Sequence, residues 1–170
     1  MIRAVTVADA HDICRIYNHY VLNTTISFEE AAVETGAMAA RIAAATLPWL
    51  VHEEQGNVVA YAYATPWRVR AAYRFSAECS VYVAAGATGR KLGLGLYRHL
   101  FDALRERGMQ SVICGIAQPN AASVALHEKL GFNKVAHFER VGWKHGRWID
   151  VGYWQMQLNR DETHPPAVHY

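Results

Sequence analysis

The sequence predicts a single α+β domain. Its 170 residues match the length of one ordinary domain. Short apolar runs of strand length alternate with segments of helical period, and no internal repeat, linker or low-complexity block divides them. We expect the domain to span residues 1–160. The tail, residues 161–170, contains Pro165 and Pro166 and is expected to be loose.

The first half of the chain predicts two helices and three strands. A short strand is expected over residues 2–6, then a helix from an Asp9 cap to about residue 22. An alanine-rich helix follows over residues 33–45. Residues 49–54 and 58–65 form a hairpin around a turn at 55–57, and Pro66 ends it.

The second half predicts a strand over residues 75–83, with Glu78 and Tyr82 on the face opposite Ala77 and Cys79. A glycine-rich segment, residues 86–95, opens a helix that reaches about residue 107, where Gly108 ends it. A strand at 111–117 and a helix at 120–130 come next. Two antiparallel strands, 134–141 and 148–158, complete the domain around a turn at 144–147.

Composition excludes several classes of protein. The chain is 52% hydrophobic and 19% charged, which is typical of a folded globular protein. Its net charge of +2 is too small to indicate a nucleic-acid or membrane surface, so neither partner is expected. Cys14, Cys79 and Cys114 are far apart, which predicts no metal site and no disulfide framework. With no signal pattern and no apolar run of spanning length, we expect a cytoplasmic protein.

The glycine-rich segment is the strongest chemical signal. A helix N-terminus presents unpaired N–H groups and a positive dipole end, and glycines let a phosphate approach the backbone. Arg90 and Lys91 add positive charge there. The alternative is an ordinary strand-to-helix loop. The P-loop and Rossmann patterns do not fit, because no Lys-Ser or Lys-Thr follows and the loop comes mid-chain.

Two motifs resemble the GNAT acetyltransferase superfamily. After the strand, Gly89-Arg90-Lys91-Leu92-Gly93-Leu94-Gly95 resembles its motif A, [RQ]xxGx[GA]. The letters fit from Arg90, but we favour the ungapped alignment, which starts at Thr88 and puts Lys91 and Gly93 at the two glycine positions. Residues 120–132, NAASVALHEKLGF, resemble the second signature. Asn120 is either a helix cap or a ligand of the pantetheine arm, and both roles are compatible.

The resemblance implies a GNAT fold, with a mixed, mostly antiparallel central sheet and helices on both faces, and acetyl-CoA as co-substrate. The residues that it implies for acetyl-CoA binding are Val81, Tyr82, Val83, Gly89, Arg90, Lys91, Leu92, Gly93, Leu94, Asn120 and Lys129. It also implies that the Val83 N–H stabilises the oxyanion.

The likeness narrows further. Residues 63–73, 77–83 and 142–155 look like those of phosphinothricin acetyltransferases and their methionine-sulfoximine-acetylating relatives, and the similarity covers residues 2–158. This implies a homodimer that transfers acetyl directly to the amino group of a small amino acid analogue. Two other readings stay open: acetylation of another amine, such as a peptide N-terminus or polyamine, and a non-catalytic acyl-CoA-binding sensor.

Catalysis needs a base for the amine and an acid for the leaving thiolate. Glu78, three residues before Val81, matches the family's base; otherwise it is a solvated or paired strand carboxylate. Tyr97 and His127 are both candidates for the acid, and otherwise are packed helix residues. The sequence leaves open which of them donates the proton.

Trp67, Arg68 and Arg70, which follow Pro66, are candidates for binding the substrate. Arg68 and Arg70, next to Trp67, either clamp an anionic group or are exposed loop arginines. Phe28 and Tyr73 either line the pocket or pack in the core. We expect the aromatic residues Trp143, Trp148, Tyr153 and Trp154 to be mainly core, with some at a dimer interface.

Overall fold

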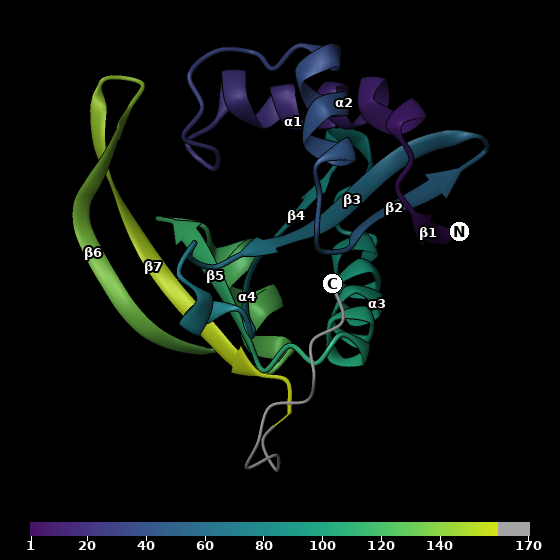
Figure 1. The fold of residues 1–170 in the computed structure, drawn as a ribbon. Coiled ribbons are helices and arrows are strands. Elements are labelled where there is room, and N and C mark those ends of the chain that lie inside the picture. Colours follow the sequence, from purple (N-terminus) through teal and green to yellow (C-terminus); the bar gives the residue numbers. More distant parts are fainter. Residues whose placement is uncertain (160–170) are drawn as a thin grey trace.

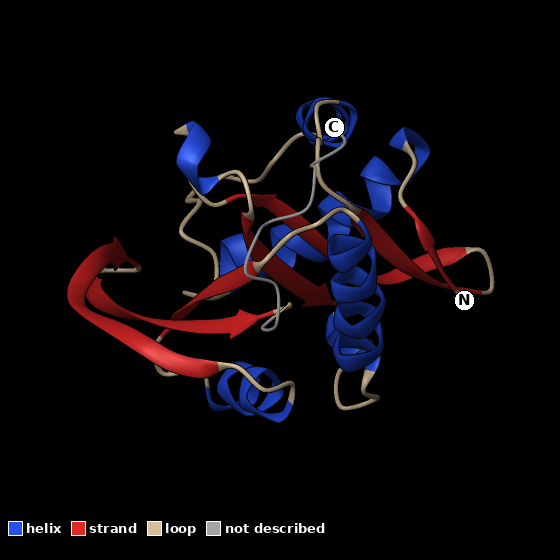
Figure 2. Cartoon of the chain, turned by 60° about the horizontal axis from the view of Figure 1, so that its bottom comes forward, coloured by secondary structure: helices blue, strands red, loops and turns tan. Residues whose placement is uncertain are grey.

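The computed structural model describes residues 1–159 as one seven-stranded sheet with helices on both faces (Figures 1 and 2). The expected loose tail, 161–170, lies outside the described residues. Strand order is β1-β2-β3-β4-β5-β7-β6, and each neighbouring pair is antiparallel except β4 and β5. The predicted α+β class and the mixed, mostly antiparallel sheet are therefore confirmed.

The elements follow the predicted order. The strands are β1 (Ile2–Ala4), β2 (Trp49–Glu54), β3 (Asn57–Pro66), β4 (Ser76–Val83), β5 (Ser111–Ala117), β6 (Asn133–Lys144) and β7 (Arg147–Gln157). The α-helices are α1 (Ala10–Asn23), α2 (Thr35–Ala43), α3 (Leu92–Glu106) and α4 (Ala121–Lys129). Short 3-10 turns, which the sequence did not indicate, lie at Val7–Asp9, Ala71–Tyr73 and Ala85–Ala87.

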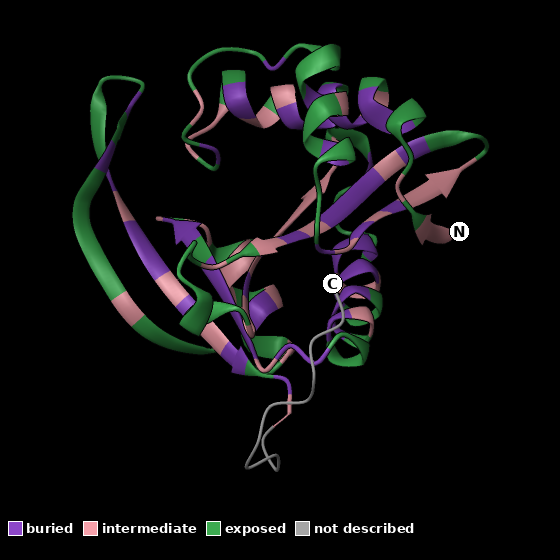
Figure 3. Ribbon diagram, in the orientation of Figure 1, coloured by how far each residue is buried: buried purple, intermediate pink, exposed green. Residues whose placement is uncertain are grey.

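Two hydrophobic cores cover the two faces of the sheet (Figure 3). On one face α3 packs through Leu96, Leu100 and Leu104. On the other, α1 and α2 pack over Val51 and Tyr61. Alternation along β4 obeys the predicted pattern, because Ala77 and Cys79 join the first core while Tyr82 packs against the second. Glu78 therefore faces the side covered by α1 and α2.

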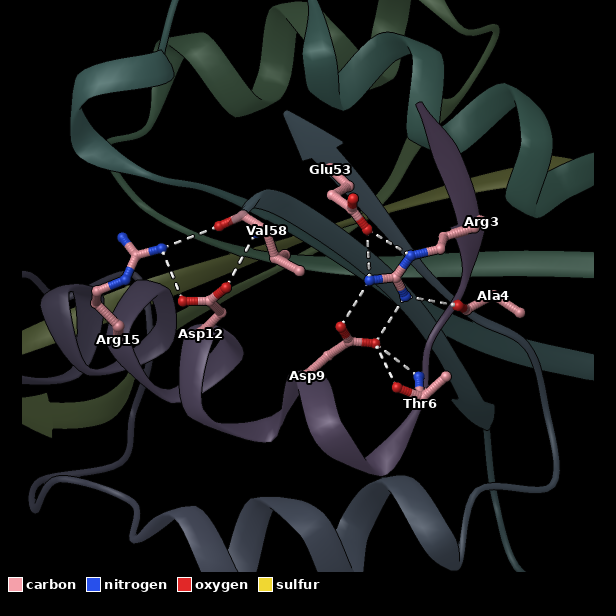
Figure 4. Close-up of polar contacts among 8 residues, drawn as sticks. All are labelled: Arg3, Ala4, Thr6, Asp9, Asp12, Arg15, Glu53 and Val58. Atoms are coloured by element: carbon pink, nitrogen blue, oxygen red, sulfur yellow. Dashed lines mark hydrogen bonds and ion pairs between the residues drawn. The ribbon is translucent and has the colours of Figure 1, made fainter. Parts of the chain in front are cut away.

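The start of α1 corrects one expectation. Asp9 makes no side-chain cap bond to α1. Its carboxylate instead accepts from the Thr6 backbone N–H at 2.7 Å and from both terminal nitrogens of Arg3 at 2.8 Å (Figure 4). Arg3 also donates to Glu53 on β2 at 2.8 Å. The Asp9 carboxylate binds the Arg3 guanidinium instead of capping α1, because a charged partner binds a carboxylate more strongly than a helix N–H does.

The last two strands form a long hairpin that curves away from the sheet, so that its turn lies at the level of the α1–α2 layer (Figure 1). β6 runs to Lys144, three residues beyond its predicted end, and the turn tightens to His145 and Gly146, both with positive φ. Trp143 and Trp148 are 54% and 49% exposed and contact each other, so the core is excluded for these two members of the aromatic set, and a place at a dimer interface stays a prediction. Trp154 is buried as expected.

Candidate active site

A gap between β4 and β5 organises the site. These parallel strands pair only at Ser76↔Ser111, Ala77↔Val112 and Glu78↔Ile113. Beyond Glu78 the two strands no longer pair with each other, while β4 continues along β3 and β5 along β7. Three cavities lie along this opening, of about 530, 60 and 480 Å³. We call them the cofactor cavity, the junction cavity and the acceptor cavity.

The three cavities are contiguous. Ile26 and Tyr82 line all of them. Asn120 and Ser123 are shared by the cofactor and junction cavities, and Gly115 by the junction and acceptor cavities. A ligand in the cofactor cavity therefore reaches one in the acceptor cavity through the junction.

All eleven residues that the sequence proposed for acetyl-CoA binding line the cofactor cavity. They come from the end of β4, the following loop, the first turn of α3, and α4 with its cap. The sequence missed several neighbours in the same wall, which are Tyr20, Ile26, Ala87, Thr88, Ala122, Ser123 and Leu126. Tyr20 comes from α1 and donates its hydroxyl hydrogen bond to the Val83 carbonyl, a contact that no local pattern announces.

The N-terminus of α3 suits a phosphate group. The first N–H groups of a helix have no partner within it, and α3 begins at Leu92 beside the cavity. Lys91 has a φ of 63°, in the left-handed region that glycine favours. This supports the alignment that puts Lys91 at a family glycine position. Gly93 packs closely, since a Cβ there would lie 3.4 Å from Leu126 and 3.5 Å from Val81.

The positive charge of Arg90, beside this loop, is paired with a carboxylate of the sheet. Arg90 donates to Glu54 of β2 at 2.7 Å, and both groups are partly exposed. The pair lowers the pKa of the Glu54 carboxyl. Arg90 thus lines the cofactor cavity in a fixed position, although an exposed pair of this kind adds little stability.

Asn120 caps α4, as its position in the second motif predicts. Its side-chain oxygen accepts from the Ser123 N–H at 3.1 Å. The amide nitrogen is not used by this bond, and Asn120 lines both the cofactor and junction cavities. The cap and a contact to a bound ligand are therefore compatible in geometry.

The two candidate acids meet at the junction cavity. The Tyr97 hydroxyl lies 3.2 Å from Nε2 of His127, and both side chains are buried. Nδ1 of His127 lies 2.7 Å from the Ser123 carbonyl, which can only accept, so Nδ1 carries a proton. In neutral His127, Nε2 then accepts from Tyr97. Burial lowers the pKa of His127 and raises that of Tyr97, so both groups favour their uncharged forms.

Glu78 lines the acceptor cavity together with a second carboxylate, Glu29. Burial raises the pKa of Glu78, and the nearby Arg68 opposes that rise. Arg41 lowers the pKa of Glu29, which it binds at 2.8 Å. One carboxyl is thus poised to take up a proton while the other is kept ionised.

Phe28 and Tyr153 form walls of the acceptor cavity. A Cβ on Gly142 would lie 2.4 Å from the Phe28 ring, so the ring rests directly on the β6 backbone. Gly115 forms part of the wall between Tyr153 and Glu78, where a Cβ would lie 3.2 Å and 3.6 Å from their side chains. A side chain at position 115 would therefore reduce the space beside Glu78.

The remaining predicted substrate residues divide into two groups. Trp67 packs edge-on against Tyr153 at 5.7 Å, and Arg68 stacks on Trp67 at 4.0 Å from the ring centre. Neither of these two residues lines the acceptor cavity, although Trp67 contacts Tyr153, which does. Arg70 and Tyr73 are exposed and line none of the three cavities. The structure does not bring these last two residues into the site within the described chain.

Within residues 1–159, no helix is long and apolar enough to cross a membrane. Over the same residues, no group of three or more His, Cys, Asp or Glu side chains is arranged to hold a metal ion.

Comparison with known proteins agrees with this geometry. Residues 2–152 match the acetyltransferase (GNAT) domain family. The chain is 39% identical over 159 residues to a phosphinothricin N-acetyltransferase of Streptomyces viridochromogenes, covering 92% of this chain and 87% of the relative. It is 40% identical over 161 residues to an L-methionine sulfoximine/L-methionine sulfone acetyltransferase of Salmonella typhimurium, covering 93% and 94%.

A solved structure shows the same fold. It is a GNAT superfamily phosphinothricin acetyltransferase from Sinorhizobium meliloti in complex with acetyl-CoA. The two chains are 34% identical, with a TM-score of 0.93 over 98% of this chain and 92% of the other. The chain belongs to the GNAT acetyltransferase family and is an acyltransferase. Within that family it groups with the phosphinothricin and methionine sulfoximine acetyltransferases.

Proposed function

We propose that this protein transfers the acetyl group of acetyl-CoA to the amino group of a small amino acid analogue of the phosphinothricin or methionine sulfoximine type. The observation that carries the proposal is the row of three contiguous cavities. A phosphate-binding helix N-terminus lies at one end and Glu78 lies at the other. The names of the similar enzymes supply the substrate class.

The geometry divides the chemistry into three tasks. The cofactor cavity holds acetyl-CoA, with the pyrophosphate at the start of α3 and the pantetheine arm along β4 and Asn120. Glu78 takes the proton from the ammonium group in the acceptor cavity. At the junction, Tyr97 and His127 act as one hydrogen-bonded unit that supplies a proton to the leaving thiolate.

Transfer is proposed to be direct. A covalent route needs a nucleophile, and the thiols near the junction are Cys79 and Cys114. Burial raises the pKa of Cys114 to about 12 and that of Cys79 well above its usual value. Because the thiolate is the reactive form, neither thiol is suited to accept the acetyl group. The amine that Glu78 has deprotonated therefore attacks the thioester carbonyl itself. As the C–S bond breaks, the nitrogen gives up its second proton to solvent, and the thiolate takes its proton from the Tyr97–His127 unit.

The acceptor cavity also supports a second candidate function. The charged residues in its wall are two carboxylates, Glu29 and Glu78. Arg68 is close enough to lower the pKa of Glu78 but does not line the cavity. An acidic wall suits a cationic acceptor such as a polyamine. Amino acid analogues remain the first proposal, because Arg68 is near enough to Glu78 to affect its pKa and because the named relatives are acetyltransferases of such analogues.

A panel assay tests the proposal. Purified protein is mixed with acetyl-CoA and one acceptor at a time, and the release of free thiol is measured. The acceptors are phosphinothricin, methionine sulfoximine, methionine sulfone, plain amino acids, a polyamine and an alanyl peptide. Turnover of the amino acid analogues in preference to the rest is expected. Preference for the polyamine or the peptide would mean that another amine is the acceptor. If no acceptor in the panel causes thiol release, an acyl-CoA-binding sensor would be favoured.

We also propose a cytoplasmic homodimer that uses no metal and has no nucleic-acid or membrane partner. Support for the cytoplasm comes from the three cysteines, which are free and buried. The net charge of +2 supports the absence of a polyanionic partner. The exposed apolar residues of the β6–β7 hairpin support the dimer.

A further inference from the structure

Lys144 is buried at the end of β6, with only 3% of its surface exposed. Lysine is rarely buried to this extent without partners, because moving its ammonium group out of water is costly. The proposed chemistry gives Lys144 no task, since it lines none of the three cavities. Its position therefore needs another explanation.

The ammonium group of Lys144 holds two backbone carbonyls, one in the last turn of α1 and one in the loop that follows it. Its Nζ donates to the carbonyl oxygens of Val21 and Ser27, each at 2.6 Å. These short, charge-assisted bonds compensate for the loss of water. Burial lowers the pKa of Lys144, while the carboxylates of Glu30 and Glu29 act in the opposite direction.

The loop that Lys144 holds is the segment between α1 and α2, residues 24–34. It has no helix or strand of its own. Ile26, Ser27, Phe28 and Glu29 of this loop line the acceptor cavity, and Val151 and Tyr153 of β7 line the wall across from it. Lys144 thus joins the loop to the hairpin that carries the other wall. His145 adds a weaker contact, with Nε2 3.3 Å from the Thr24 carbonyl.

The other side of the loop is tied to α1 and α2 by separate bonds. Tyr17 contacts Ser27 at 2.8 Å and donates to Glu29 at 2.9 Å, and Arg41 pairs with Glu29. Asn18 bonds the backbone of Val33 at both of its amide atoms. Loss of Lys144 would leave these anchors intact, so the loop would stay near α1. Its tie to the hairpin would then consist of the packing of Phe28 on Gly142 and the weaker His145 contact, without the two short bonds from the ammonium group.

We infer that Lys144 is a positioning residue for acceptor binding: by holding the Val21 and Ser27 carbonyls, it sets the distance between the 24–34 loop and the β6–β7 hairpin, and so the width of the acceptor cavity. This inference rests on the proposed function, because the cavity is assigned to the acceptor there. Lys144 does not touch the reacting atoms. Its effect passes through the loop that carries Phe28 and Glu29.

Three variants test the inference. Lys144→Met keeps the length and apolar stem but removes the donors, and Lys144→Arg restores a cation with donors. Lys134→Met is the matched control, since Lys134 is an exposed lysine on the same strand. For each variant we would measure KM and kcat for the best acceptor, the Kd of acetyl-CoA, the melting temperature, and amide hydrogen exchange over residues 21–34.

For Lys144→Met we expect the acceptor KM to rise about tenfold, with a smaller change in kcat and an acetyl-CoA Kd within about twofold of wild type. Exchange over residues 24–34 should quicken, and Lys144→Arg should recover part of the KM. Lys134→Met should resemble wild type. A fall in melting temperature without a change in acceptor KM would show that Lys144 only stabilises the fold and would overturn the inference. So would equal losses of affinity for both substrates.

Failure of the proposed function is distinguishable from failure of this inference. If wild-type protein acetylates no acceptor in the panel, the proposed function falls, and the exchange measurement still decides whether Lys144 holds the loop. Unchanged exchange over residues 24–34 in Lys144→Met would refute the anchoring role whether or not the protein is active.

Discussion

Glu78, the proposed base, and His127, one of the two proposed acids, show how one physical effect shifts the pKa values of two groups in opposite directions. Burial disfavours charge, so it raises the pKa of the Glu78 carboxyl and lowers that of the His127 imidazole. A carboxylate with a raised pKa is a better base for an ammonium proton. In the proposed mechanism, a neutral imidazole whose Nε2 accepts from Tyr97 has no proton on that nitrogen, so it orients the phenol, and the phenol proton of Tyr97 is the one that the leaving thiolate would take. Both residues were predicted from the sequence, but their environments were not.

Glu78→Gln should lower kcat/KM by about 10²-fold or more, because it removes the base. In wild type, activity should fall as the pH drops through the raised pKa of Glu78, and this acid limb should vanish in the variant. The Kd of acetyl-CoA should not change. Steady-state kinetics across pH, with calorimetry for acetyl-CoA, measure these effects.

Glu106→Gln, an exposed carboxylate on α3, is the matched control and should behave as wild type. Stability gives an independent check. A folded-state pKa that is raised means that the folded form loses stability as pH rises through it, so Glu78→Gln should be at least as stable as wild type near pH 7. If the variant retains full activity at every pH, another group or water takes the proton.

At the scale of elements, short-range signals predicted the helices and strands well because each signal acts locally. Gly108 and Gly131, both with positive φ, follow the ends of α3 and α4 as expected. Asn120 begins α4 as expected. The signal failed at Asp9, where the guanidinium of Arg3, six residues earlier, binds the carboxylate. It also failed at β6, where bulges near Ala136 and between Phe138 and Gly142 break the alternation.

Asn120 allows the two roles of the α4 cap to be separated. Asn120→Ala should cost about 1 kcal/mol of stability through loss of the cap bond to the Ser123 N–H. Asn120→Asp keeps an oxygen that can accept this bond, so stability should return. Asn120→Asp has no amide N–H donor, so its affinity for acetyl-CoA should be below that of wild type, as in Asn120→Ala. Urea unfolding and calorimetry measure the two effects.

The comparison of the two variants is the test. If Asn120→Asp restores both stability and acetyl-CoA affinity, the amide of Asn120 makes no contact with the ligand and the residue serves only as a cap.

For the whole molecule, the exposed apolar side chains of the β6–β7 hairpin are the feature that a single chain leaves unexplained. Val135, Phe138, Val141, Trp143 and Trp148 are between 49% and 56% exposed. Figure 3 shows that β6, at the edge of the sheet, is largely exposed along its length. A sheet edge and an apolar face of this kind invite association, and a twofold dimer would cover both copies.

We therefore predict a homodimer in solution that depends on this hairpin. Light scattering at micromolar protein should give twice the mass of the 19.0 kDa chain. Trp143→Lys with Trp148→Lys should shift the protein to monomer, because two charges would be buried at the interface. Val7→Lys places a charge at an exposed apolar residue outside the hairpin and should leave the dimer intact. A monomeric wild type would contradict the prediction.

The sequence by itself determined the family, the order of the elements and most of the residues of the cofactor cavity. These follow from short motifs whose residues lie close together along the chain, as in the loop from Gly89 to Leu94 and the cap at Asn120. The acceptor side depended on the tertiary structure. Its walls come from the 24–34 loop, β4, β5 and β7, and no local pattern relates these segments.

The tertiary structure alone decided that Tyr97 and His127 share one hydrogen bond, and that Arg70 and Tyr73 lie outside the cavities. It also decided that Lys144 is buried, although its sequence neighbours suggest an exposed turn. The physical reason is the same in each case. Burial, and the pKa shifts and fixed distances that follow from it, depend on which distant segments pack together. Sequence spacing does not carry that information once the segments are more than a few turns or one hairpin apart.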